Sequence, residues 1–399
     1  MVKVDMKRKK IVTVTAIVLI CPVFLSGCWD RKEINDIAFI LGTAVDKEGS
    51  KYRTSVQIAV PKELGGSIGK SGGGKGWYIE SKLGKTVRLS SLEIQRNNSR
   101  TINFSNRRSL IIGDELAREG ISPIMDVFTR TLQNRLQSMM AVTEGSAYKI
   151  LDTDAPIEQF PTEMVRELIM NFTKEAISIK SVLNALLSDG IDPVLPLLKV
   201  DDSVPSKVGE PMKNLRIVGL AIFKGDRMVG TLKGDMVKIM ILSMNQNRNT
   251  EMSIPAPEGE GDLVFLFKDS NARFVPTIHG DDVTMKFHIR MEGSLVENAS
   301  NFSPTNEVGM RKLEQLLGDK VRKDLIEVLD ILQNEYHADS LGFGEIIHQH
   351  KPKEWDRLSS RWKDIYPHVK VEIETDVQLK TVGQALKPMG LPQEEIIHD

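Results

Sequence analysis

The chain alternates apolar and polar side chains without a break along Val283-Thr284-Met285-Lys286-Phe287-His288-Ile289-Arg290-Met291. Successive side chains of a β-strand point to opposite faces, so this pattern predicts a strand with one face in a core and the other in water. The surrounding residues 262–296 hold three β-rich runs in all, which favours an antiparallel sheet. A helix is expected over about 306–336, because apolar residues recur there at helical spacing and its other face is charged.

The segments on either side of this region continue the same two patterns. Upstream, residues 215–232 predict a hairpin around the turn at Gly225 and Asp226. Downstream, a helix opening at Pro352 places Trp355 and Trp362 on one stripe, and residues 369–375 alternate as a last strand. These elements predict a C-terminal α+β domain at 214–385, followed by a tail at 386–399.

The first half of the chain predicts a second unit. The apolar run 37–45 and the alternation that ends before Pro61 favour a hairpin, 102–112 is strand-like, and helical patterns occur at 86–98, 121–132, 161–172 and 181–187. Residues 201–213 are polar, contain prolines and show no period, which is typical of a linker. We therefore expect an N-terminal α+β region at 28–200, with a subdomain inserted at about 56–145. The predicted fold is α+β and multi-domain, with mostly antiparallel sheets packed against helices.

The composition limits the classes of protein to which the chain can belong. It has 399 residues, of which 41% are hydrophobic and 27% are charged, so the chain has enough apolar material for two or three folded domains. Lys and Arg total 53 against 54 for Asp and Glu, which leaves a net charge of -1. No overall basic field favours nucleic acid, and we expect no nucleic-acid partner.

The first thirty residues resemble an export signal. Five basic residues precede an uncharged run from Ile11 to Trp29, whose first part is strongly apolar. The run ends in Leu25-Ser26-Gly27-Cys28, which resembles a bacterial lipobox. We predict a lipoprotein signal peptide at 1–27, with a diacylglyceryl group on the Cys28 sulfur and an acyl group, such as palmitate, on its amino group. The alternative is a membrane-spanning anchor of about 20 residues in which this thiol is incidental.

Acylation at Cys28 has consequences for the rest of the chain. Two or more acyl chains give stable attachment to a membrane without a spanning helix. Cys21 follows two bulky residues that do not fit a peptidase pocket, and it is removed with the signal peptide. The mature chain then has no free thiol, which excludes thiol catalysis and zinc bound by Cys. Trp29 is a candidate for contact with the membrane interface, where indoles are favoured, and packing against the domain is its alternative.

Several motifs are similar to those of one known family. In chain order they are Cys28-Trp29-Asp30-Arg31-Lys32-Glu33-Ile34-Asn35-Asp36, Leu41-Gly42-Thr43-Ala44-Val45-Asp46, Leu110-Ile111-Ile112-Gly113-Asp114-Glu115-Leu116-Ala117-Arg118-Glu119-Gly120, Gly219-Leu220-Ala221-Ile222-Phe223-Lys224-Gly225-Asp226, Gly342-Phe343-Gly344-Glu345, Pro352-Lys353-Glu354-Trp355, Trp362 and Tyr366-Pro367. With them the chain resembles the Ger(x)C family, the lipoprotein C subunits of bacterial nutrient germinant receptors. The departures are Tyr366, where Phe is commoner, and a glycine-rich loop at 65–76.

The resemblance implies a role in spore germination. It implies a subunit on the outer face of the spore inner membrane, beside an A-type and a B-type integral membrane subunit, that helps them respond to nutrients. It also implies an α+β fold of several domains. No enzymatic activity and no cofactor come with the family.

The residues that could form a catalytic, phosphate-binding or metal-binding site also have structural explanations. Gly69-Lys70-Ser71 ends like a phosphate-binding loop, but its first glycine is missing and no apolar helix follows. The histidines His337, His348 and His350 have no evident further ligand, and the acidic pairs 201–202 and 281–282 fit solvated turns. No nucleophile motif is present. Trp355 and Trp362 are either core residues or a partner-binding stripe.

Two other functions have to be weighed against this one. An extracytoplasmic solute-binding lipoprotein that holds the nutrient itself is the first alternative; such proteins usually contain βαβ units around a cleft, whereas this chain predicts antiparallel hairpins. A lipoprotein hydrolase would need a nucleophile or metal constellation. We expect a lipid-anchored, non-enzymatic subunit of a membrane receptor complex.

Overall fold

The computed structural model describes residues 33–60, 76–131, 134–203, 212–304 and 306–381, together with residues 15, 392, 394 and 396–398. Cys28 and Trp29 lie outside the described residues, as do Cys21 and Gly69-Lys70-Ser71.

Residues from both halves of the chain form one large sheet. In the described residues it has nine strands, in the order β3-β2-β1-β5-β6-β7-β8-β9, and β4 pairs with β1. The strands are β1 (Ile37–Glu48), β2 (Lys51–Ala59), β3 (Trp77–Gly84), β4 (Thr101–Asn103), β5 (Ser109–Gly113), β6 (Met139–Thr143), β7 (Val194–Ser203), β8 (Met212–Lys224) and β9 (Arg227–Leu232). The pairs β1–β2, β2–β3, β7–β8 and β8–β9 are antiparallel, as predicted for the two hairpins.

The centre of this sheet is parallel. β1, β5, β6 and β7 run in the same direction, and helices connect β5 to β6 and β6 to β7. All five residues of β5, and all five of β6, are buried, because helices cover both faces. Leu110 and Ile112 pack on one face with α4 (Asp114–Glu119), α5 (Ser122–Arg130) and α8 (Ile179–Leu187). Ile111 packs on the other face with α6 (Tyr148–Leu151) and α7 (Pro161–Phe172).

Two expectations about domain limits need correction. Residues 56–145 supply the central strands β5 and β6, so they are part of the large sheet rather than a separate insertion. In the predicted linker 201–213, the described residues are paired strand: Asp201 lies opposite Asn214, and Asp202 opposite Lys213. Their polarity reflects a hairpin end that extends into solvent. The division at this hairpin into an N-terminal and a C-terminal domain remains a proposal.

A second sheet forms the other end of the molecule. Its order is β10-β11-β12-β14, with β10 (Thr250–Pro255), β11 (Asp262–His279), β12 (Asp282–Asn298) and β14 (Lys370–Thr381). β12 contains the alternating stretch 283–291, and its burial alternates as predicted. The expected three β-rich runs at 262–296 are in fact two long strands. β14 joins them parallel to β12 rather than antiparallel, because a helical connection separates the two strands.

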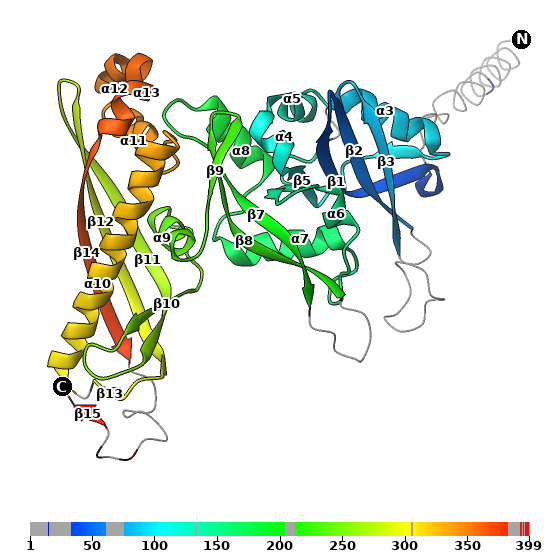
Figure 1. Cartoon of the computed structure of the whole chain (residues 1–399). Helices are drawn as coiled ribbons and strands as arrows, with labels where there is room; N and C mark the ends of the chain where they lie inside the picture. The colour runs from blue at the N-terminus through cyan, green and yellow to red at the C-terminus, as the bar shows by residue number, and fades with distance from the viewer. Residues whose placement is uncertain are drawn as a thin grey trace, which may run out of the picture.

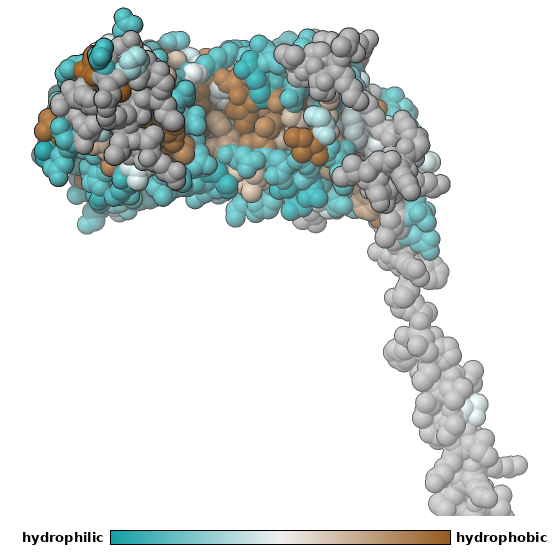
Figure 2. Space-filling model, turned by 90° about the horizontal axis from the view of Figure 1, so that it is seen from below, coloured by the Kyte–Doolittle hydropathy of each residue, from teal (hydrophilic) through white to brown (hydrophobic). Residues whose placement is uncertain are grey.

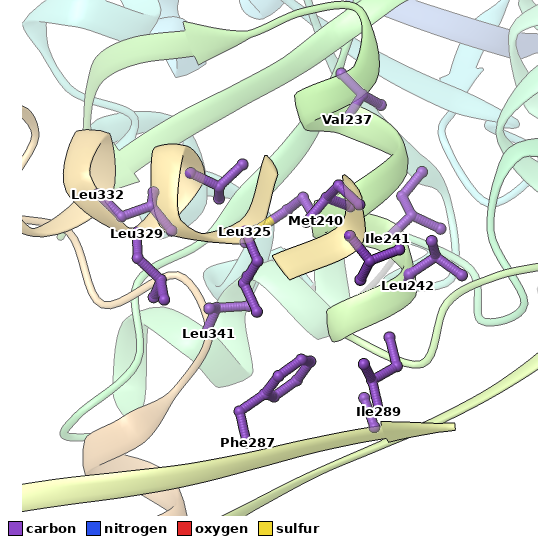
Figure 3. Close-up of a cluster of buried hydrophobic side chains, with 14 of the residues drawn as sticks. Val237, Met240, Ile241, Leu242, Phe287, Ile289, Leu325, Leu329, Leu332 and Leu341 are labelled. Atoms are coloured by element: carbon purple, nitrogen blue, oxygen red, sulfur yellow. The ribbon is translucent and has the colours of Figure 1, made fainter. Parts of the chain in front are cut away.

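One face of the second sheet is covered by helices. α10 (Glu307–Asp330) runs along it, and Asn306 caps the helix by accepting hydrogen bonds from Val308 and Gly309 N–H. A π-helical turn (Ile331–Glu335) continues it to the predicted length. Figure 3 shows Leu325 and Leu329 of α10 and Met240 of α9 (Asp235–Ser243) above Phe287 of the sheet.

The helix predicted from Pro352 is broken into short pieces. They are α12 (Pro352–Leu358), a 3-10 turn (Ser359–Arg361), α13 (Trp362–Ile365) and a second 3-10 turn (Tyr366–His368), and α11 (Phe343–His350) precedes them. Two further short strands, β13 (Phe302–Ser303) and β15 (Ile397–His398), pair with each other.

The described elements form an elongated body (Figure 1), with α3 (Val87–Asn97) near one end and α10 with β14 at the other. Figure 2 shows hydrophobic residues gathered along the middle of one face of this body. The fold is multi-domain α+β with mixed, mostly antiparallel sheets and helices, as predicted.

Candidate functional site: the junction between the two sheets

The junction is the place where the chain after α8 meets α11 and α12. Gly190 has a left-handed backbone with φ 85°, and its carbonyl accepts a hydrogen bond of 2.9 Å from Glu345 N–H. A Cβ built on Gly190 would lie 2.6 Å from Gly344 backbone and 2.7 Å from the Trp355 ring. No side chain fits there, so glycine allows the close approach of the two segments.

Two carboxylates bind the segments to each other. Asp192 accepts hydrogen bonds from Gly225 N–H at 2.6 Å and from Asp339 N–H at 2.7 Å. In return, the Asp192 N–H donates to the Asp339 carbonyl at 3.0 Å. Asp192 therefore connects the β8–β9 hairpin of the large sheet to the loop before α11.

Asp339 organises the start of α11 and the segment that follows. Its side chain accepts hydrogen bonds from Phe343 N–H at 2.8 Å, from Gly344 N–H at 2.9 Å and from the Trp362 indole N–H at 2.9 Å. Burial raises the pKa of Asp339 to about 7, against the lowering effect of these donors, and the nearby Asp192 charge adds to the rise. Burial also raises the pKa of Asp192.

Both candidate tryptophans line this junction. Trp355 is 3% exposed and Trp362 is 6% exposed, and their rings meet edge to face with centroids 5.4 Å apart. His348 stacks on Trp355, and Tyr366 packs against Trp362 while its hydroxyl donates to the Ala338 carbonyl. This burial favours core packing over a partner-binding stripe, because neither indole offers a surface that a partner can reach.

A cavity of about 350 Å³ lies beside the junction, between α8, α9 and α11. Its charged lining residues in the described chain are the acids Glu175, Asp192 and Glu345, and most of the other lining is apolar. Ser340 also lines it; its side chain is 1% exposed and its hydroxyl has no hydrogen-bond partner in the described chain. The cavity has the size and mixed lining of a small-molecule pocket, but the residues around it provide no nucleophile with an adjacent base.

The remaining candidates make structural contacts. His337 Nδ1 contacts the Gln333 carbonyl of the preceding π-helical turn, and His350 Nδ1 contacts the Ile346 carbonyl of α11. Asp281 sits in the β11–β12 turn as predicted, but the Arg357 and Arg361 side chains bind it at 3.0 and 2.8 Å, and Arg361 lowers its pKa. Asp201 lies in β7 rather than in a turn and pairs with Arg216.

Neither a metal-binding cluster nor a membrane-spanning helix occurs in the described residues. They contain no group of three or more His, Cys, Asp or Glu side chains arranged to hold a metal ion. Within the same part of the chain, no helix is both long and apolar enough to cross a bilayer.

Sequence reasoning missed Asp192, Asp339 and Gly190 as members of one site. Asp339 precedes the Gly342-Phe343-Gly344-Glu345 motif by three residues, and Asp192 follows the Asp189-Gly190 helix stop. The signal available in the sequence was the pair Gly342 and Gly344 shortly after Asp339, followed by the two tryptophans. Their proximity depends on the packing of segments about 150 residues apart, which no local pattern encodes.

The comparisons with known proteins agree with this architecture. Residues 30–200 match the model of the spore germination protein N-terminal domain, and residues 218–383 match the spore germination B3/GerAC-like C-terminal model. The chain is 34% identical to the putative spore germination protein YfkR of Bacillus subtilis over 93% of its own length and 97% of the relative. It is 22% identical to spore germination protein KC of the same organism, over 96% and 98% of the two chains.

A solved structure shares the fold. The crystal structure of the GerBC protein aligns with a TM-score of 0.53 at 16% identity, covering 88% of this chain and all of that one. With both family models matched over most of its length, the chain belongs to the Ger(x)C family of spore germination proteins.

Proposed function

We propose that the protein is a lipid-anchored, non-enzymatic subunit of a spore nutrient germinant receptor, and that it acts through contacts with A-type and B-type integral membrane subunits. The observation that carries the proposal is the match to both family models along 30–200 and 218–383. The relatives named above are called spore germination proteins. The role in a receptor goes beyond those names and is part of our proposal.

The sequence before the described body supports the anchor. The lipobox ends at Cys28, only five residues before Glu33, where the main described part of the chain begins. The acylated residue would lie on the outer face of the spore inner membrane, with Trp29 at the interface. The anchor keeps the elongated body beside the membrane subunits.

Fatty-acid labelling tests the anchor. In sporulating cells given labelled palmitate, the wild-type protein should carry label and Cys28→Ala should carry none. Cys21→Ala is the matched control, because it alters a thiol in the same signal peptide and should leave labelling intact. Label that persists in Cys28→Ala contradicts the anchor assignment.

Co-purification tests the partners. The acylated protein, solubilised in mild detergent from spore membranes, should bring down the A-type and B-type subunits in the same preparation. A folded, labelled protein that isolates without either subunit contradicts the proposal, even if the anchor is correct.

Two observations favour a second candidate, a lipoprotein that binds the nutrient directly. The parallel strands β5, β6 and β7 with their helical connections are βαβ units, which the sequence analysis did not anticipate. The 350 Å³ cavity beside Asp192 offers a pocket. Calorimetry of the intact protein with amino acids and sugars separates the candidates: micromolar binding supports the second, and no heat of binding supports the first.

A further inference from the structure

The exposed face of α3 combines arginines with leucines. At about 100° per residue, Arg88, Leu89, Leu92 and Arg96 fall within an arc of about 100°. Leu89 is 45% exposed and Leu92 is 40% exposed, so these leucines present apolar surface beside the arginines. Val87 and Ile94, in contrast, are buried against the sheet.

A groove of about 730 Å³ continues this surface toward α5. Leu92, Ile102 and Phe104 give it an apolar lining, and Arg88 and Arg130 stand on its two walls. Arg130 pairs with Asp126 at 2.7 Å, an exposed pair that adds little stability by itself. We call the exposed residues of 85–100 together with this groove the α3–α5 face.

The α3–α5 face is basic although the chain as a whole is not. Residues 85–100 with Asp126 and Arg130 of the groove hold five basic side chains against the two acids Glu93 and Asp126, a local net charge of +3 in a chain of net charge -1. Glu93 pairs with Arg96 at the surface. Positive charge beside exposed leucines is the combination that binds an anionic membrane surface.

The start of the described body lies at the same place. β4, which follows Arg100, pairs in parallel with the first residues of β1, so that Ile37 lies opposite Thr101. Ile37 is nine residues from Cys28, and nine extended residues span at most about 30 Å. A lipid on Cys28 would keep this end of the molecule near the bilayer, while α10 lies at the other end (Figure 1).

We propose that the α3–α5 face docks on anionic phospholipids of the same bilayer that holds the anchor, with its arginines on lipid phosphates and Leu89 and Leu92 at the interface. The inference rests on the proposed lipid anchor. Each basic residue near an anionic surface strengthens binding about fivefold, so three of them orient a tethered body firmly. Docking fixes which side of the elongated body faces outward.

Depth-dependent quenching tests the docking. The acylated mature chain has no other free thiol, so Leu92→Cys can carry a single fluorophore, and Ile326→Cys on α10, at a site 55% exposed, is the matched control. The labelled proteins are reconstituted in vesicles of 70% phosphatidylcholine and 30% phosphatidylglycerol that contain a nitroxide lipid. Quenching at position 92 should be at least threefold stronger than at position 326, and it should weaken in pure phosphatidylcholine.

Charge reversal of the arginines is the second test of the docking. Arg88→Glu, Arg96→Glu and Arg100→Glu together should abolish the excess quenching at position 92 while leaving the melting temperature nearly unchanged, because these side chains are exposed. Equal quenching at the two positions, or quenching that ignores anionic lipid, overturns the proposal. Quenching at position 92 that appears only when the integral membrane subunits are present also overturns it, since the face would then bind protein.

Failure of the anchor is separable from failure of the docking. Flotation of the vesicles shows whether the acylated chain is attached at all. If it is not, the mature chain is held instead on nickel-chelating lipid through an amino-terminal histidine tag, and the same pair of labels decides the docking.

Discussion

Charged residues serve opposite purposes at the junction and on the outer face of the second sheet. At the junction, Asp339 is buried and Asp192 is half-buried; both accept hydrogen bonds from N–H groups and have raised pKa values. On the outer face, β12 and β14 place Lys286, His288 and Arg290 directly opposite Glu372, Glu374 and Asp376 in the solvent. The same residue types are expected to control stability in the first region and to contribute little in the second, because burial removes the screening by water.

The largest expected effect comes from removing the ring that closes the junction. Trp355→Ala deletes a buried indole and should lower the free energy of unfolding by about 3–5 kcal/mol. Urea denaturation followed by circular dichroism measures it, and Ile326→Ala at an exposed helical site is the control. A loss below about 1 kcal/mol would mean that the junction does not hold the two sheets together.

The next effect is a pH dependence carried by Asp339. Its pKa rises from 3.8 to about 7 on folding, so the folded state keeps a proton that the unfolded state has released. The stabilisation is therefore present at low pH and is lost as pH rises through about 7. Between pH 5 and pH 8 the loss should be about 3 kcal/mol.

Asp339→Asn isolates this contribution, because the amide does not titrate. The difference in unfolding free energy between wild type and variant should change by about 3 kcal/mol between pH 5 and pH 8, because titrating groups that do not interact with Asp339 cancel in this comparison. A difference that stays constant over this range would show that Asp339 titrates normally and that the junction is wetter than the structure indicates.

A smaller effect is expected from the indole N–H alone. Trp362→Phe keeps an aromatic ring in the junction but removes the donor that binds Asp339 at 2.9 Å. A hydrogen bond to a charged group contributes about 1.5–3 kcal/mol, so a loss of about 2 kcal/mol is expected at pH 8. The loss should be smaller at pH 5, where the carboxyl is protonated. Equal losses at the two pH values would contradict this reading of the contact.

The smallest effect belongs to the outer face. Arg290→Ala breaks a cross-strand contact of 3.6 Å to Asp376, yet both side chains are more than half exposed. The unfolding free energy should change by no more than about 0.5 kcal/mol in 0.15 M salt. A loss comparable to that of Trp362→Phe would remove the distinction between the two regions.

The sequence predicted the second sheet better than the first. Alternation along 283–291 reveals a strand with one buried face, and this is the geometry of β12. β5 and β6 are buried on both faces and lack alternation, so neither their direction nor their place at the sheet centre could be inferred. Asp201 and Asp202 lie near a hairpin end that extends into solvent. Linkers are also exposed to solvent, so the two kinds of segment have the same polar composition.

The junction was predicted only in part. Trp355 and Trp362 were identified from their spacing, and the structure brings them together in the core. The predicted single helix is broken between them, so their contact does not come from helical periodicity. Asp192 and Asp339 are 147 positions apart and meet through tertiary packing. Cys28 and Trp29 lie outside the described residues, and their roles rest on sequence.

We propose that a lipid on Cys28 attaches this body to a membrane. Intact-mass measurement of the protein purified from spore membranes tests it most directly. We expect a chain that begins at residue 28 and carries the mass of a diacylglyceryl group plus an amide-linked acyl chain. A chain that retains residues 1–27, or that begins at an unmodified Cys28, would contradict it.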